Sequence, residues 1–221
     1  MRLFNKLFYI IIILLILALG YSYFRQIREK QILKQIIQRL EADSRIAEAL
    51  VTAVKTDRSG RQLTTIKFLE YDVDGRPLKP KYFTFHDNLI QFQSLVIRFD
   101  DFYVEQADRL RGKSAYLFMK AFVLAGAETE EFGITKINSI PDGYKIPGLV
   151  DSFESRLWKK FWHYALEPEE AKRLGIKSAQ IEAPGTKFIP GSIYTIKIEH
   201  DGGMRIDTKP LPQILRGEKI E

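Results

Sequence analysis

The most pronounced hydrophobic pattern lies at the start of the chain, where residues 7–24 read LFYIIIILLILALGYSYF without a charged side chain. A helix of these eighteen residues would be roughly 27 Å long, close to the ~30 Å hydrocarbon thickness of a bilayer. Lipid tails offer the backbone no hydrogen bonds, so a helix is the structure that such a segment adopts there. Residues 7–24 are therefore predicted to be a transmembrane helix in contact with the lipid bilayer, after a short basic tail over residues 1–6.

A cleaved signal peptide is the alternative interpretation of this segment. Arg2 and Lys6 form a basic start, and Ala18-Leu19-Gly20 places small residues at the two positions that a signal peptidase inspects. However, the apolar run is longer than the ~7–15 residues usual in a signal peptide, and it continues past Gly20 into aromatic residues. A retained signal-anchor that crosses the cell membrane once is the preferred prediction.

The following segment, residues 25–58, is predicted to be helical because it contains no proline or glycine. Apolar residues alternate in it at spacings of three and four: Leu33, Ile36, Leu40, Ala47, Leu50 and Val54. Asp43 is the charged residue that interrupts this seam. The pattern is typical of an amphipathic helix on the domain's own core, or of a coiled-coil stalk. The second alternative predicts a homo-oligomer through residues 33–54.

After Gly60 the hydrophobic period changes to two, which is typical of β-strands. Strands are predicted over residues 65–71, 81–86, 89–103, 114–124, 179–182, 192–200 and 204–208, with a short one near 134–137. The first four are expected to form an antiparallel meander, because short connections pair neighbouring strands. Asp201-Gly202-Gly203 between the last two is the strongest hairpin signal in the chain.

Two helices are predicted between these strands, over residues 149–165 and 168–174. In the first, apolar side chains recur at every fourth position, and the two tryptophans stand beside them: Phe153, Leu157, Phe161, Ala165, Trp158 and Trp162. This face is expected to pack on the sheet, with one tryptophan free to protrude. The fold class is thus α+β, a mostly antiparallel β domain over residues 60–212 with a helical insertion, followed by a charged tail over 213–221.

Charge and composition narrow the range of partners. The net charge is +6, but lysine and arginine are interleaved with acidic residues, so nucleic acid is not expected as a partner. One local excess of positive charge follows the anchor: Arg25, Arg28, Lys30, Lys34 and Arg39. A literal positive-inside count would keep the domain in the cytoplasm, where it could bind anionic lipid. Long domains translocate largely regardless of charge, however, and we expect an extracytoplasmic domain.

The sequence offers little catalytic chemistry. It contains no cysteine and three histidines on separate elements, so no metal site or cofactor is expected. Nucleophile-elbow, P-loop and dinucleotide-binding motifs are absent from the sequence. The densest acidic cluster is the first place to look for a catalytic site, with a histidine as a further candidate: Asp100, Asp101, Glu105, Asp108 and His86.

These patterns predict a single-pass membrane protein whose soluble domain binds or scaffolds at the cell envelope, with an unknown envelope protein as partner. The sequence favours a protein that is not an enzyme. The alternative is a membrane-anchored hydrolase or metal-dependent enzyme that uses the carboxylates of residues 100–108. A second alternative is a lipid-binding domain that faces the cytoplasm.

Overall fold

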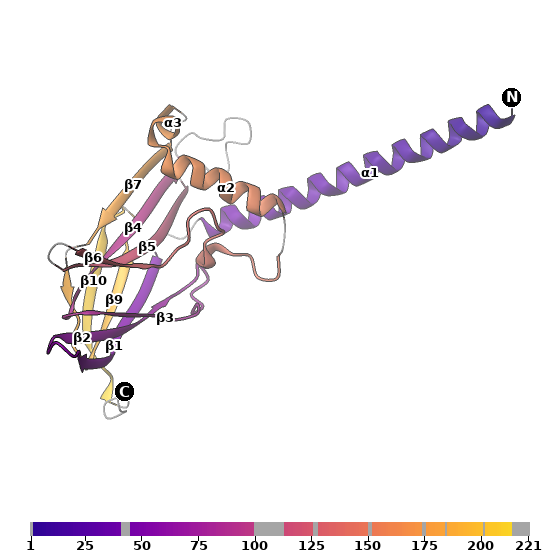
Figure 1. Ribbon diagram of the computed structural model, residues 1–221. Helices are drawn as coiled ribbons and strands as arrows, with labels where there is room; N and C mark the ends of the chain where they lie inside the picture. Colours follow the sequence, from indigo (N-terminus) through magenta and orange to yellow (C-terminus); the bar gives the residue numbers. More distant parts are fainter. Residues whose placement is uncertain are drawn as a thin grey trace.

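The computed structural model describes residues 2–40, 45–99, 113–125, 128–149, 152–173, 176–183, 185–200 and 202–213. A long N-terminal helix projects from a domain of antiparallel strands, and short helices lie against that domain (Figure 1). The α+β class predicted from the sequence is confirmed.

Helix α1 (Arg2–Arg39) is uninterrupted over 38 residues, which makes it about 57 Å long. Its side chains from Phe8 to Phe24 are exposed, with Gly20 partly covered. Within the described residues, it is the one helix that is long and apolar enough to cross a membrane. The opposite end of α1 is part of the domain's core, where three of its side chains and the residue that follows it are buried: Ile32, Ile36, Ile37 and Leu40.

Strand β1 (Arg45–Thr56) lies in the second half of the helix predicted over residues 25–58, so that prediction is wrong for residues 45–56. The buried residues of β1 alternate with period two: Arg45, Ala47, Ala49, Val51 and Ala53. Neighbouring strands bond β1 along both edges, and this tertiary pairing overrides the helix propensity of its alanines, leucine and glutamate.

A continuous helical seam over residues 33–54 is consequently wrong. Ile36 and Leu40 face the protein's own core, and Ala47 lies inside a β-sheet. Asp43 lies outside the described residues. The end of α1 is therefore an amphipathic helix that packs on the domain's own core. Self-association stays a prediction, but a helical seam over residues 33–54 cannot provide its surface.

Two antiparallel sheets form the domain. The first has the strand order β10–β9–β1–β2–β3, and the second has the order β6–β5–β4–β7 with β8 paired to β4. The bounds in the first sheet are β2 (Gln62–Glu70), β3 (Lys81–His86), β9 (Ser192–Ile198) and β10 (Met204–Pro210). Those in the second are β4 (Leu89–Phe99), β5 (Lys113–Ala125), β6 (Glu128–Gly133), β7 (Ile176–Glu182) and β8 (Thr186–Lys187).

The predicted four-strand meander is correct only in its two halves. β2 pairs with β3, and β4 pairs with β5, but β3 and β4 belong to different sheets. Asp87, in the turn between β3 and β4, has a φ of 61°, a left-handed conformation that aspartate tolerates in turns. The hairpin of β9 and β10 is confirmed, whereas the short strand expected near 134–137 falls earlier, as β6.

The second sheet lies between the first sheet and the helices. Aromatic side chains of both sheets meet in one core, where Phe68 of β2 stacks on Phe92 of β4 with ring centroids 5.5 Å apart. The other face of the second sheet turns Leu95 and Leu117 toward a second core, shared with α1 and with α2 (Ser152–Leu166). The sequence therefore buries β4 on both faces.

Helix α2 packs against this outer core, and α3 (Pro168–Arg173) follows it. Trp158 and Trp162 retain 4% and 0% exposure, so the expectation of a protruding tryptophan is wrong. The indole Nε1 of Trp162 donates a hydrogen bond of 2.6 Å to the carbonyl oxygen of Ser139. That bond attaches α2 to the segment that follows β6, which includes the 3-10 turn η2 (Asp142–Tyr144).

Candidate functional site

His86 is the candidate site residue that the structure describes. The other four candidates, Asp100, Asp101, Glu105 and Asp108, lie outside the described residues. His86 ends strand β3 and is half-buried, at the edge where β3 of the first sheet approaches β6 of the second. Phe83 of β3 contacts Phe132 of β6 at this edge, with ring centroids 5.3 Å apart.

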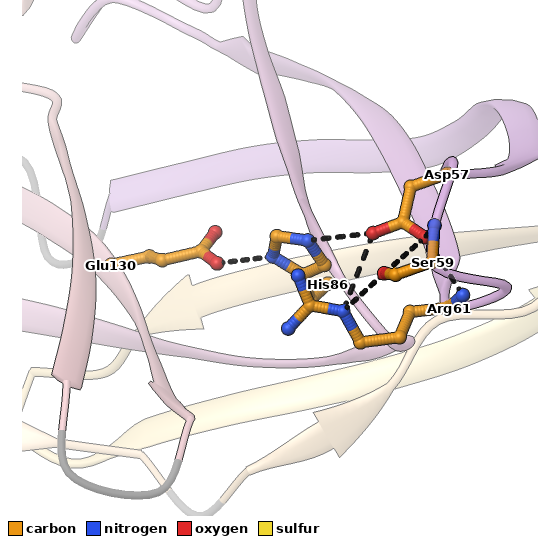
Figure 2. A network of polar contacts seen from close by, with 5 residues as sticks. All are labelled: Asp57, Ser59, Arg61, His86 and Glu130. Atoms are coloured by element: carbon orange, nitrogen blue, oxygen red, sulfur yellow. Dashed lines mark hydrogen bonds and ion pairs between the residues drawn. The ribbon is translucent and has the colours of Figure 1, made fainter.

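The imidazole of His86 lies between two carboxylates that come from different elements (Figure 2). Its Nδ1 is 2.5 Å from Oε1 of Glu130, on β6. Its Nε2 faces Oδ2 of Asp57 across 3.5 Å, at the turn between β1 and β2. An imidazolium offers an N–H to both carboxylates, whereas a neutral imidazole offers only one. The imidazole of His86 therefore links the β1–β2 turn of the first sheet to β6 of the second sheet at one edge.

Asp57 organises the turn on its side of this network. Its Oδ1 accepts hydrogen bonds from the Ser59 hydroxyl at 2.7 Å, from the Ser59 backbone N–H at 2.8 Å and from the Arg61 backbone N–H at 2.9 Å. Chiefly the hydroxyl of Ser59, and then the backbone N–H of Arg61, hold the pKa of Asp57 well below its usual range. Asp57 therefore stays ionised as the acceptor of the turn and as the partner of His86.

This network lacks the geometry of a nucleophilic site. In a Ser–His–Asp triad the histidine lies between the serine and the acid, so that it can accept the serine's proton. Here the hydroxyl of Ser59 donates a hydrogen bond directly to Asp57 (Figure 2). The Nε of Arg61 donates a hydrogen bond of 3.1 Å to the hydroxyl oxygen of Ser59. Among the described residues there is also no group of three or more histidine or acidic side chains that could hold a metal ion.

A second polar cluster is buried inside the domain, around Arg45 at the start of β1. The guanidinium is 1% exposed; its Nη2 forms an ion pair with Oε1 of Glu70, and its Nη1 donates to the carbonyl oxygen of Gly143 at 3.3 Å. Burial raises the pKa of Glu70, and the positive charge of Arg45 opposes that rise. Arg45 also lies over the ring of Tyr144, 5.1 Å from its centroid.

Tyr144 and Gly143 fix the geometry of this cluster. The hydroxyl of Tyr144 accepts a hydrogen bond of 2.9 Å from the backbone N–H of Tyr116, on β5, and complete burial raises its pKa to about 12. A β-carbon at position 143 would overlap the guanidinium of Arg45, so any larger residue there would displace that guanidinium. The cluster links η2 to both sheets and lies inside the protein, where it is a structural element.

Sequence reasoning selected His86 but missed both of its partners. Asp57 lies at the end of the segment predicted to be helical, and Glu130 lies between the strands predicted over 114–124 and 134–137. The only local signal was Asp57-x-Ser59-Gly60, an Asx-type turn sequence. The pairing with Glu130 spans 44 residues and depends on the meeting of two sheets. The other histidines remain apart: His163 is exposed beside Glu170 at 2.9 Å, and His200 lies in the β9–β10 turn.

Comparison of the chain with protein families, with curated proteins and with solved structures gives no match. The functional argument therefore rests on the fold and on the chemistry of the described side chains.

Proposed function

We propose that the protein is a single-pass membrane protein whose soluble domain is a binding or scaffolding module held at the cell envelope. The observation that carries the proposal is α1, which is one uninterrupted helix from an exposed apolar half into the domain's core. The apolar half, from Phe8 to Phe24, is not covered by any part of the chain that the structure describes. A bilayer would cover it along a length that matches the hydrocarbon thickness.

Two further features support a binding role over catalysis. The described histidine network is occupied by its own carboxylates at both ring nitrogens. The buried Arg45 cluster is enclosed and held by neighbouring elements. Neither the histidine network nor the Arg45 cluster places a nucleophile beside a free base. Acyl and phosphoryl transfer commonly require that arrangement. An extracytoplasmic domain agrees with the basic residues Arg2 and Lys6 ahead of the apolar run of α1.

Mass spectrometry of the mature protein and fractionation of membranes test this proposal. We expect the residues before Tyr21 to be retained, and the protein to remain in the membrane fraction after a wash with high salt. A mature chain that begins at Tyr21 and is recovered in the soluble fraction would refute anchoring. Protease treatment of intact spheroplasts should digest the domain. Protection there would place the domain in the cytoplasm.

A further inference from the structure

A pocket of about 120 Å³ opens at the end of the domain near α1, next to the buried Arg45 cluster. Its walls come from β2, from the segment that enters β3 and from the segment that follows β6. Among the residues that line it are three lysines: Lys79, Lys81 and Lys136. Apolar walls of Phe68 and Ile134 support them from inside the core.

Two segments of the chain place these lysines at the pocket. Lys79 and Lys81 are two residues apart in an extended segment, so their side chains leave the same face. Pro80 between them disfavours helical backbone at Lys79 and so keeps that segment extended. Lys136 approaches from the other side of the pocket, on a segment held by the bond from Trp162 to Ser139.

The lysines that line the pocket outnumber its carboxylates, three to two. None of the three forms a salt bridge with any residue that the structure describes. Lys81 attracts the carboxylate of Glu70, but Glu70 is paired with Arg45, and Asp142 lies 3.3 Å from Lys145. The pocket lining therefore carries an excess of positive charge.

We infer that this pocket binds a phosphate group. Phosphate carries more charge than a single carboxylate, and lysine is a common point-charge ligand for it. The hydroxyls of Thr135 and Ser139 donate to backbone carbonyls, both at 2.6 Å, so the lysine ammonium groups are the side-chain donors of the lining that remain for the ligand. The inference rests on the proposed binding role of the domain and gives that role a ligand class.

The position of the pocket selects the source of the phosphate. The segments that form it meet α1 at Arg39, whose Nη2 lies 3.0 Å from Asp74. Arg39 is fifteen residues beyond Phe24, which is roughly 22 Å along the helix. That height exceeds the Debye length of ~8 Å and the depth of a headgroup layer. A soluble molecule or an envelope polymer therefore fits better than the lipids around the anchor.

The experiment uses the full chain in nanodiscs of zwitterionic phosphatidylcholine, titrated calorimetrically with inorganic phosphate. Sodium chloride at matched ionic strength is the reference. We expect saturable binding of one phosphate, and a loss of roughly fivefold in affinity for Lys81→Gln and for Lys79→Gln, equivalent to about 1 kcal/mol for a partly exposed charge pair. Lys209→Gln, an exposed lysine of β10, makes the same charge change outside the pocket and should leave the affinity unchanged.

Two results would overturn the inference. One is phosphate binding that does not saturate or that Lys209→Gln weakens as much as Lys81→Gln, because the effect would then be one of net charge. The other is a loss of phosphate binding when phosphatidylglycerol replaces the zwitterionic lipid, since headgroups would then be the source. Either failure leaves membrane retention of the chain untouched, so it is distinguishable from a failure of the proposed anchoring.

Discussion

Removal of one charge from the buried Arg45–Glu70 pair should cost more stability than removal of both. The side chains of Arg45 and Glu70 are 1% and 11% exposed, so neither is well hydrated when its partner is gone. Loss of one member of a buried ion pair typically costs about 3–5 kcal/mol, whereas apolar replacement of both is often neutral. Glu70 lines the lysine pocket and reaches some water there, so we expect the lower limit, about 3 kcal/mol, for Arg45→Met.

Thermal unfolding of the full chain in detergent, followed by the fluorescence of Trp158 and Trp162, measures this effect. A loss of 3 kcal/mol corresponds to a fall in Tm of about 6–12 °C for a chain of this size. Arg45→Met/Glu70→Met should recover at least about 1 kcal/mol of that loss. Arg205→Met is the matched control, because its pairs with Glu199 and Asp207 are exposed and should contribute less than about 0.5 kcal/mol.

The pH dependence gives the same variant a second readout. Without Arg45, the burial of Glu70 is opposed only by the weaker attraction of Lys81, so its folded-state pKa rises further above the unfolded value. The folded state then binds a proton that the unfolded state releases, and stability falls as the pH rises between those two values. Arg45→Met should therefore regain stability on acidification toward roughly pH 5. A variant that loses less than about 1 kcal/mol, or a double variant as unstable as the sum of both singles, would refute the reasoning.

Two other predictions concern the N-terminal boundary and the turn at Asp57. A chain that begins at Gly60 should aggregate, because it lacks β1 from the middle of the first sheet. A chain that begins at Arg25 should unfold cooperatively in urea. A folded chain that begins at Gly60 would contradict the sheet order. The lowered pKa of Asp57 means that its stabilising contribution is complete above the unfolded value of roughly pH 4 and is lost as the pH falls through the folded value. The stability difference between the wild type and Asp57→Asn, measured in urea, should therefore shrink on acidification, and a difference independent of pH would contradict this.

The parts of the fold that the sequence predicts well are those with a local cause. β9 alternates buried and half-buried positions because one of its faces lies on the core, and a Gly-Gly turn joins it to β10. Residues 45–56 were misread because Ala47, Leu50 and Val54 also satisfy a helical spacing. Their strand structure comes from β2 and β9 on either side, and β9 begins more than a hundred residues away in the sequence.

The candidate site shows the same division between local and distant causes. The Asx-type turn around Asp57 could be recognised from its sequence, but the contact between His86 and Glu130 follows from the arrangement of β3 and β6 at the edges of two sheets. The three lysines of the pocket lie in two segments that no periodicity connects. Both sites are products of the tertiary fold, so composition and spacing alone could not predict them.

The structure of α1 bears directly on how the domain would work at a membrane. A flexible linker would let the domain turn freely, but the apolar face of the last turns of α1 packs in the core, which joins the helix directly to the domain. Residues 25–31 separate the apolar segment from the first buried residue, Ile32, by roughly 10 Å of helix. Glu29 in this spacer lies 3.5 Å from Arg156 of α2, which fixes that helix beside it. An anchored domain would thus keep its lysine pocket at a fixed height above the bilayer, where it meets ligands from the aqueous side.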